Sequence, residues 1–168
     1  MLLRVLFVCY ENICRSPMAE GIFSALVRRD ARAESIVVES AGTVCYQKGS
    51  LPDSRAVLVA GRYGIDISPL RARCIDELDL GLFDWIFTMD EENYQDVSSC
   101  FGGAGPVYMM THFDPHAACQ DIADPYYGSE DDFLRVYKQL DRAIGYAYRQ
   151  ILGGLHSSGS SDIDGFSR

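Results

Sequence analysis

Residues 4–17 read RVLFVCYENICRSP, and this stretch decides the architecture around it. Val5 to Val8 is apolar and rich in β-branched residues, which favours a buried strand of an α/β sheet. Ser16 is a good N-cap, and Pro17 suits the first helical position, where its missing N–H costs nothing. The stretch therefore predicts a strand, a short loop, and a helix that begins where the loop ends.

The loop between the two elements, residues 9–15, brings a thiol and a guanidinium together. Loop amides and the positive end of a helix dipole make a site for an anion. Arg15 adds a planar, two-pronged donor that suits phosphate or a similar tetrahedral anion. The same field favours the thiolate of Cys9, which is the nucleophilic form. We predict a phosphate-binding loop with a nucleophile; a buried strand-end cysteine beside a surface arginine is the alternative for such a short motif.

The rest of the chain alternates strand and helix patterns, which predicts an α/β fold: a single domain with a four-stranded parallel sheet, helices on both faces, and the phosphate-binding loop after the first strand. In such sheets the ligand site lies beyond the carboxyl ends of the strands. We therefore expect Ser40, Asp90 and Asp124 to gather beside the phosphate-binding loop. The predicted strands cover residues 3–8, 35–39, 84–88 and 106–110, and the predicted helices cover 17–30, 53–63, 90–97 and a final segment after Ser129.

Length and charge limit the classes of function. The 168 residues suit one domain, which we place at 1–152, followed by a flexible Ser/Gly/Asp-rich tail over 153–168. The formal charge of −9 argues against nucleic-acid binding, which needs a basic surface. No apolar run reaches membrane-spanning length and no signal peptide pattern begins the chain, so we expect no membrane partner.

The cysteines indicate a redox environment. Their scattered positions fit a reducing cytosol better than a disulfide framework, so we expect a cytoplasmic protein. No Cys-x2-Cys pair suggests structural zinc, and His112, His116 and Cys119 match no strong metal template. We therefore expect no metal and no cofactor. The six cysteines are Cys9, Cys14, Cys45, Cys74, Cys100 and Cys119.

The segment from Val8 to Pro17 resembles the signature of the low-molecular-weight protein tyrosine phosphatases, and the resemblance extends over about residues 3–152. It implies a phosphoric monoester hydrolase that acts on phosphotyrosine-containing proteins without a cofactor, as a monomer or weak homodimer. Further motifs typical of the family follow in order: Ser40-Ala41-Gly42-Thr43, Pro52-Asp53-Ser54-Arg55-Ala56, Arg71-Ala72-Arg73, Met89-Asp90 and Asp124-Pro125-Tyr126-Tyr127-Gly128.

The resemblance assigns three catalytic roles. The Cys9 thiolate attacks phosphorus and forms a phosphocysteine, while Arg15 holds the equatorial phosphoryl oxygens. Asp124 protonates the leaving phenolate and then deprotonates the attacking water. Pro125 favours an extended Asp124, although an Asp-Pro pair by itself more often starts a turn.

Other residues of the loop and its surroundings support this chemistry. We expect the Ser16 hydroxyl to donate to the Cys9 sulfur. The resemblance implies that Asn12 adopts a left-handed conformation, which asparagine tolerates better than most residues. It also implies that Ser40 hydrogen-bonds Asn12; the alternative for Ser40 is a strand-end turn residue. The substrate-binding residues of the loop are Tyr10, Glu11, Asn12, Ile13, Cys14 and Ser16.

Aromatic residues and a second cysteine complete the predicted site. A deep aromatic slot would favour phosphotyrosine, because phosphoserine is too short to reach the thiolate; local packing of the same rings is the alternative. Cys14 is close enough to Cys9 to resolve its oxidised form as a disulfide, or it is simply a small buried hydrophobic residue. The candidate slot residues are Tyr10, Tyr46, Tyr126 and Tyr127.

Two residues depart from the family pattern. Glu11 stands where the family usually has glycine, and a carboxylate beside a dianion site is expected to weaken substrate binding. Leu70 stands near a position where many relatives carry a histidine that joins the hydrogen bonds of the loop. Because Leu70 cannot make these hydrogen bonds, the sequence does not show whether Asn12 is held rigidly.

Two other functions remain as alternatives. An arsenate reductase on the same scaffold would need further cysteines to relay a disulfide; Cys74 and Cys119 exist, but no closely spaced downstream pair does. A non-catalytic phosphotyrosine-binding module, impaired by Glu11, would keep the loop without the turnover.

Overall fold

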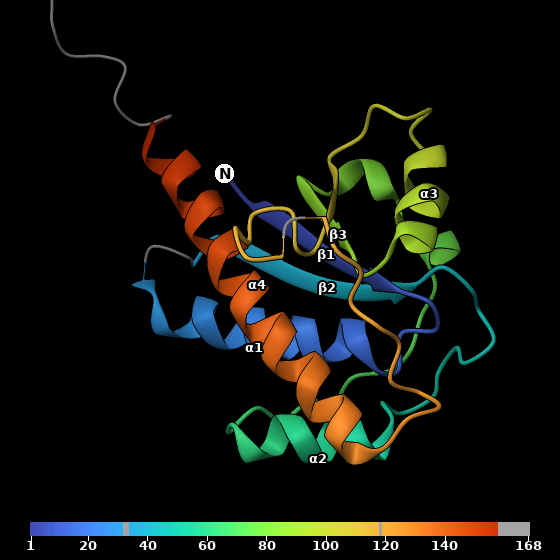
Figure 1. The fold of residues 1–168 in the computed structure, drawn as a ribbon. Helices are drawn as coiled ribbons and strands as arrows, with labels where there is room; N and C mark the ends of the chain where they lie inside the picture. Colours follow the sequence, from blue (N-terminus) through green and yellow to red (C-terminus); the bar gives the residue numbers. More distant parts are fainter. Residues whose placement is uncertain (32–33, 118, 158–168) are drawn as a thin grey trace, which may run out of the picture.

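The computed structural model describes residues 1–31, 34–117 and 119–157. The chain forms a four-stranded parallel sheet in the order β2-β1-β3-β4, with β1 at its centre (Figure 1). The strands are β1 (Leu3–Cys9), β2 (Ile36–Gly42), β3 (Trp85–Thr88) and β4 (Val107–Met109). The helices are α1 (Arg15–Arg29), α2 (Ser54–Arg62), α3 (Glu91–Ser99) and α4 (Glu130–Ser157), with short 3-10 turns η2 (Ile75–Glu77) and η3 (Leu80–Leu82).

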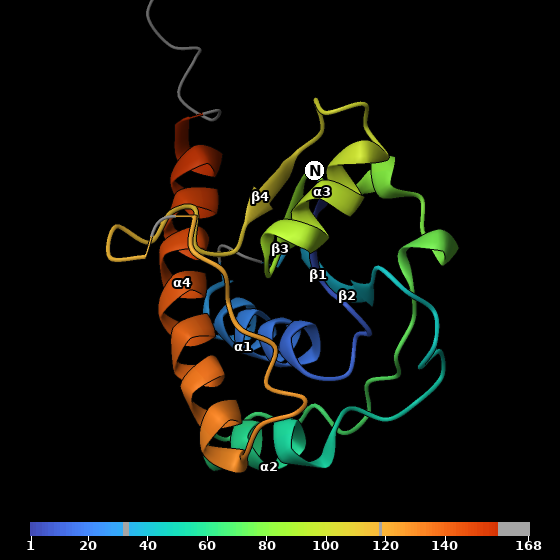
Figure 2. The same ribbon diagram turned by 45° about the vertical axis from the view of Figure 1, so that its right-hand side comes forward.

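Helices cover both faces of the sheet, because the side chains of β1 alternate between two cores. Val5 and Phe7 pack with apolar residues of α1, α2 and α4. Leu6 and Val8 point to the opposite face and pack with the smaller cluster that contains Val97 of α3. Figure 2 shows α1 and α4 on one side of the sheet and α3 on the other. The predicted single-domain α/β architecture is confirmed.

The last helix is longer than predicted. α4 continues through Gly153 and Gly154 to Ser157, so these glycines lie within the helix and not in a tail. Glycine in a helix costs only about 1 kcal/mol, and the preceding turns pack on the core through a buried stripe that reaches Leu152. The remainder of the predicted tail, 158–168, lies outside the described residues.

The start of α1 also differs from the prediction. The helix begins at Arg15 with Cys14 at its N-cap position, and no side chain caps it. The prediction that Ser16 is the N-cap is therefore wrong. The Ser16 hydroxyl is buried and turned inward, 3.0 Å from the Cys9 sulfur and 2.7 Å from Asn12 Nδ2. Tertiary contacts take the hydroxyl that a cap would use.

A disulfide joins Cys45 and Cys74, so the expectation of scattered free cysteines is wrong for this pair. The two are 29 positions apart in the sequence, but Gly42 at the end of β2 pairs with Cys74 as an isolated parallel bridge. This pairing leaves the two Cα atoms 5.1 Å apart, within the range that a disulfide requires. The cysteines that stay free are Cys9, Cys14, Cys100 and Cys119. Within the described ranges, no helix combines the length and the apolar character needed to cross a membrane.

An ion pair between a buried carboxylate and a half-exposed arginine ties the long loop after β4 to the final helix. The Asp114 side chain is fully buried, and Arg142 of α4 donates to it through Nε at 2.6 Å. The backbone N–H of His116 donates to the same carboxylate at 2.9 Å. Burial by itself would raise the pKa of Asp114, but these hydrogen bonds outweigh it and lower the pKa below its ordinary value.

Replacing Arg142 should therefore destabilise the protein. We expect Arg142→Gln to lower the free energy of unfolding at pH 7 by about 2 kcal/mol, because a buried carboxylate loses its charged donor. A lowered folded pKa stabilises the protein above the unfolded value of about 4, and this contribution is lost as the pH falls. The difference between wild type and variant should therefore shrink between pH 5 and pH 3, as measured by urea denaturation.

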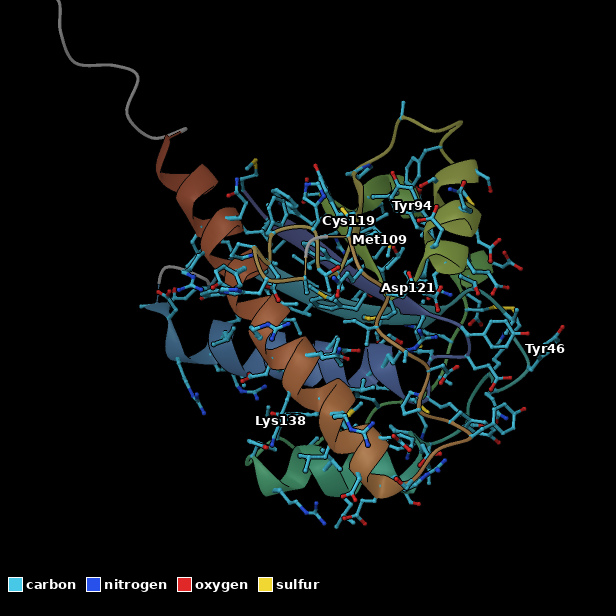
Figure 3. All side chains as sticks on the ribbon, viewed as in Figure 1. Tyr46, Tyr94, Met109, Cys119, Asp121 and Lys138 are labelled. Atoms are coloured by element: carbon cyan, nitrogen blue, oxygen red, sulfur yellow. A yellow bond between two sulfur atoms is a disulfide. The ribbon has the colours of Figure 1, made fainter. Side chains whose placement is uncertain are left out.

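The matched control is Lys138→Gln on the same helix. Lys138, labelled in Figure 3, is exposed and forms no ion pair with a described residue, so its loss should change the unfolding free energy by less than about 0.5 kcal/mol. An Arg142→Gln variant as stable as this control at pH 7 would contradict the role assigned to the ion pair.

Candidate active site

The loop between β1 and α1 lies at the floor of a cavity of about 230 Å³. The cavity opens beyond the carboxyl ends of the strands, where ligand sites of parallel α/β sheets occur. Its lining joins the phosphate-binding loop to the loop after β2 and to the long loop before α4. The lining residues are Cys9, Tyr10, Glu11, Ile13, Cys14, Arg15, Gln47, Asp124, Tyr126 and Tyr127.

Arg15 is a buried charge with partners at both terminal nitrogens but none among the described residues at Nε. Its Nη1 donates to Asp90 at 2.7 Å and to the carbonyl of Ile122 at 2.8 Å. Its Nη2 is 3.5 Å from the Asp124 carboxylate, and its Nε–H is buried with no partner among the described residues. Since a buried donor without a partner is costly, the Nε–H is suited to donate to a bound anion.

The charge of Arg15 is secured by its surroundings. Burial by itself lowers the pKa of the guanidinium, but the negative charge of Cys9 and the hydrogen bond to Asp90 outweigh burial and raise the pKa above its ordinary value. Asp90 also caps α3, where it accepts the Asn93 N–H at 2.8 Å. We predicted that Asp90 lies at this edge but not that it holds Arg15; its place directly after β3 was the available signal.

Asn12 shapes the loop in the way the resemblance implied. Its φ of 60° is the left-handed conformation. Its Nδ2 donates to Ser16 at 2.7 Å and to Ser40 at 2.9 Å, while its Oδ1 accepts the Arg73 N–H at 3.1 Å. These three hydrogen bonds hold Asn12 although Leu70 stands in place of a histidine.

The Asn12 side chain determines which groups accept in the hydrogen bonds around it. The Asn12 amide nitrogen only donates, so the oxygens of Ser16 and Ser40 accept from it. Ser40 then donates its own proton to Glu20 at 2.5 Å. The Ser16 hydroxyl lies 3.0 Å from the Cys9 sulfur and 3.5 Å from the Ala41 carbonyl, so its single proton has two acceptors within reach. Burial raises the pKa of Glu20, although its hydrogen bond from Ser40 acts in the opposite direction.

The chain that follows β2 supports the outer side of the loop. Thr43 donates its N–H to the Cys9 carbonyl at 2.9 Å, and Val44 donates to the Tyr10 carbonyl at 3.1 Å. Gly42 approaches so closely that a Cβ there would lie 2.7 Å from the Tyr10 oxygen. A side chain at this position would therefore push the phosphate-binding loop out of place.

Asp124 lies at the mouth of the same cavity. Its side chain is 44% exposed and 3.5 Å from Arg15, and it accepts the Tyr126 N–H at 3.2 Å. The turn that the Asp-Pro pair predicted and the acid that the resemblance implied are thus compatible. Asp124 and Cys9 thus line the same cavity, which brings a carboxyl group and a thiol to one site.

Arg55 holds the loop that carries Asp124. It donates to the carbonyls of Tyr126 and Gly128, each at 2.9 Å. Asp53 in turn binds the Arg55 guanidinium at 2.8 Å and caps α2 as predicted. Arg55 lowers the pKa of Asp53 below its usual range through these hydrogen bonds. The start of α2 therefore fixes the far wall of the cavity.

The predicted aromatic slot is partly present. Tyr10, Tyr126 and Tyr127 line the cavity, and the last two rings meet edge to face at 5.0 Å. Tyr46 does not line it: the side chain is 77% exposed and lies at the periphery of the molecule (Figure 3). Its neighbour Gln47 faces the cavity instead. Gln47 belongs to no motif, so the sequence carried no signal for it.

Cys14 and Glu11 both line the cavity but differ in burial. Cys14 is buried, and burial, together with the charge of Cys9, raises the pKa of its thiol far above the ordinary value. Cys14 therefore stays a neutral thiol beside Cys9. Glu11 is half-buried and forms no ion pair with any described residue.

The histidines and Cys119 of the loop after β4, which matched no strong metal template, make contacts within that loop. Cys119 lies 3.8 Å from His112, but Asp114 is already bound by Arg142. In the part of the chain that the structure describes, the one trio of possible ligands is Cys45, Cys74 and Asp76, of which two form the disulfide. The expectation of no metal and no cofactor stays a prediction.

Known proteins share this combination of fold and loop. The family model described as low molecular weight phosphotyrosine protein phosphatase matches residues 4–152. The human low molecular weight phosphotyrosine protein phosphatase is 40% identical over 145 residues, which cover 82% of this chain and 89% of that protein. A Schizosaccharomyces pombe protein with the same name is 36% identical over 143 residues.

Solved structures agree with the sequence matches. YfkJ from Bacillus subtilis superposes with a TM-score of 0.83 at 30% identity, covering 92% of this chain and 97% of that chain. A protein tyrosine phosphatase from Entamoeba histolytica, with Hepes in its active site, gives a TM-score of 0.81 at 30% identity, covering 90% and 98%. The chain belongs to the low molecular weight phosphotyrosine protein phosphatase family.

Proposed function

We propose that this phosphoric monoester hydrolase removes phosphate from phosphotyrosine in proteins through a phosphocysteine on Cys9. The observation that carries the proposal is the buried Arg15 Nε–H, which has no partner among the described residues, in the cavity that Cys9 also lines. A phosphoryl group seated there would satisfy this donor and lie within reach of the sulfur.

In the first step the Cys9 thiolate attacks phosphorus in line with the aryl oxygen. Arg15 and the loop amides stabilise the charge that spreads over the equatorial oxygens. The amides belong to residues 10–15, and the left-handed Asn12 allows the loop to curve around the anion. Asp124, at the cavity mouth, protonates the departing phenolate.

In the second step water hydrolyses the phosphocysteine. Asp124 is now a carboxylate and takes a proton from the attacking water. The Ser16 hydroxyl, 3.0 Å from the sulfur, stabilises the Cys9 thiolate as it leaves. The same hydrogen bond thus serves the nucleophile in one step and the leaving group in the next.

The cavity walls support an aryl substrate. Tyr10, Tyr126 and Tyr127 offer ring faces and edges for a phenyl group, and Ile13 adds an apolar contact beside the loop. We further propose that Cys14 resolves an oxidised Cys9, and that the protein acts in the cytoplasm as a monomer or weak homodimer without nucleic-acid or membrane partners.

The arsenate-reductase alternative has less support. Of the two cysteines that could relay a disulfide, Cys74 is bound to Cys45, which leaves Cys119 free. Arsenate-dependent consumption of thiols would favour that alternative over a phosphatase.

Cys9→Ser should abolish hydrolysis of para-nitrophenyl phosphate while phosphate binding persists, because a serine hydroxyl is not ionised at neutral pH and the anion-binding donors remain. Steady-state assays and calorimetric titration with phosphate measure the two effects. Wild type without turnover but with tight phosphotyrosine binding would instead support the non-catalytic binding module.

Asp124→Ala should lower kcat/KM, which reports the step in which the leaving group departs, by about 100-fold to 1,000-fold for phenyl phosphate, since a poor leaving group needs the proton donor. The loss should be smaller for para-nitrophenyl phosphate, whose phenolate leaves without assistance. Asp121→Ala is the matched control, because Asp121 lies in the same loop but accepts from the Glu91 N–H outside the cavity. Equal losses for both leaving groups would rule out Asp124 as the general acid.

Glu11→Gln should tighten phosphate inhibition by about threefold, because removal of a nearby like charge favours a bound dianion. Glu11→Gly tests separately whether loop freedom matters, since it removes both the charge and the side chain. Inhibition constants for phosphate and vanadate measure the effect. Constants that stay the same or rise in the glutamine variant would show that Glu11 is screened by solvent.

A further inference from the structure

We propose that the Cys45–Cys74 disulfide is a reversible redox site that sets how tightly the protein binds the aryl part of its substrate. The proposal rests on the proposed function and adds a control point outside the catalytic residues. Its basis is the position of the disulfide: it fixes the tip of the loop after β2, which places Gln47 in the cavity wall.

The base of this loop is held without the disulfide. On one side Thr43 and Val44 donate their N–H groups to the carbonyls of the phosphate-binding loop. On the other side Gly49 donates to the Ala72 carbonyl at 2.7 Å, and Ala72 donates to Ser50 at 2.9 Å. These backbone hydrogen bonds do not involve sulfur, so they remain when the disulfide is reduced.

The tip, residues 45–48, depends on the disulfide. The bond from Cys45 to Cys74 and the ion pair of Lys48 with Glu77 at 2.5 Å link it to the neighbouring segment. Within the loop, the Gln47 carbonyl and the Gln47 Oε1 accept from the Ser50 N–H at 2.8 Å and the Ser50 hydroxyl at 3.1 Å. The Lys48 side chain is 62% exposed, and exposed ion pairs contribute little to stability. Reduction therefore removes the covalent link between the tip and the Cys74 segment. Among the described residues, Gln47 then keeps only its short-range hydrogen bonds to Ser50, while the base stays in place.

Reduction of the disulfide leaves the contacts of the anion-binding loop intact. Arg73, next to Cys74, donates its N–H to Asn12 at 3.1 Å, and the Gly42 N–H donates to the Arg73 carbonyl at 2.8 Å. Both contacts belong to the base. Reduction should therefore weaken recognition of the aryl group without altering the binding of phosphate itself.

The chemistry needs a dithiol reductant and a sulfur it can reach. Cys45 is exposed whereas Cys74 is buried. A thiolate of the dithiol attacks the Cys45 sulfur, the sulfur–sulfur bond breaks, and Cys74 leaves with the electron pair and takes a proton. The second thiol of the reductant then displaces Cys45. Two electrons and two protons reach the cysteine pair, and the reductant ends as a disulfide.

A disulfide in a protein of the cytosol is usually a transient or redox-sensing one. In the proposed cytoplasmic location, the Cys45–Cys74 disulfide would therefore be open to reduction. It also separates this site from Cys9 and Cys14, which are buried in the catalytic loop and are free thiols.

The test compares two ligands on the oxidised and the reduced full-length protein. Benzylphosphonate probes the anion site and the aryl wall together, and inorganic phosphate probes the anion site alone. Alkylation and mass spectrometry verify four free cysteines before reduction by dithiothreitol and six after it. Calorimetry gives the dissociation constant of each ligand in each state, and hydrolysis of para-nitrophenyl phosphate is measured in parallel.

Reduction should raise the Kd of benzylphosphonate by about threefold to tenfold, the cost of ordering the loop tip on binding. The Kd of phosphate should change by less than about twofold, since base contacts persist. Cys45→Ser should behave like the reduced wild type and no longer respond to dithiothreitol. Cys100→Ser, which removes an exposed free thiol, should respond as the wild type does.

A benzylphosphonate Kd that is the same in both states of the wild type would overturn the proposal, and so would an equal rise for both ligands. The reduced wild type keeps the test valid if Cys45→Ser does not fold. Absence of turnover in every sample would refute the proposed function instead, because the ligand-binding comparison does not depend on catalysis.

Discussion

The site depends on how a buried guanidinium is compensated. Arg15 is only 2% exposed, and an isolated charge at that depth would be prohibitively costly. Asp90 at the end of β3 and the Ile122 carbonyl bind one side of it. On the other side Nη2 lies 3.5 Å from Asp124, and Nε–H has no partner among the described residues, so it can donate to a bound anion. The strand order brings Asp90 to Arg15, the long loop brings the Ile122 carbonyl, and the nitrogen left without a partner is suited to an anion.

Two further contacts position the loop that carries Asp124. Arg142 binds the buried Asp114 and holds the first part of the long loop on α4. Arg55 holds the last part through two backbone carbonyls. Asp124 lies between these anchors and reaches the cavity mouth with its side chain half exposed. Both anchors come from helices, α4 and α2, so the loop itself needs no regular structure.

Hydrogen bonds hold the floor of the cavity, whereas a disulfide holds part of its wall. The floor is held by the hydrogen bonds of Asn12, which keep the Ser16 hydroxyl 3.0 Å from the Cys9 sulfur. The wall near Gln47 is held at its tip by a covalent bond between Cys45 and Cys74. A change in redox state would therefore act on substrate recognition, whereas the oxidation of Cys9 acts on the chemistry.

The sequence by itself determined the strand–loop–helix unit, the parallel sheet and the identity of Cys9 and Arg15, because these follow from local periodicity and from a short, contiguous motif. Only the tertiary structure decided which partners those residues meet. The Ser16 hydroxyl serves the sulfur and not a helix cap, Gln47 takes the place predicted for Tyr46, and a disulfide spans 29 positions. Contacts between distant segments depend on how the loops cross at the sheet edge, and no local pattern encodes that crossing.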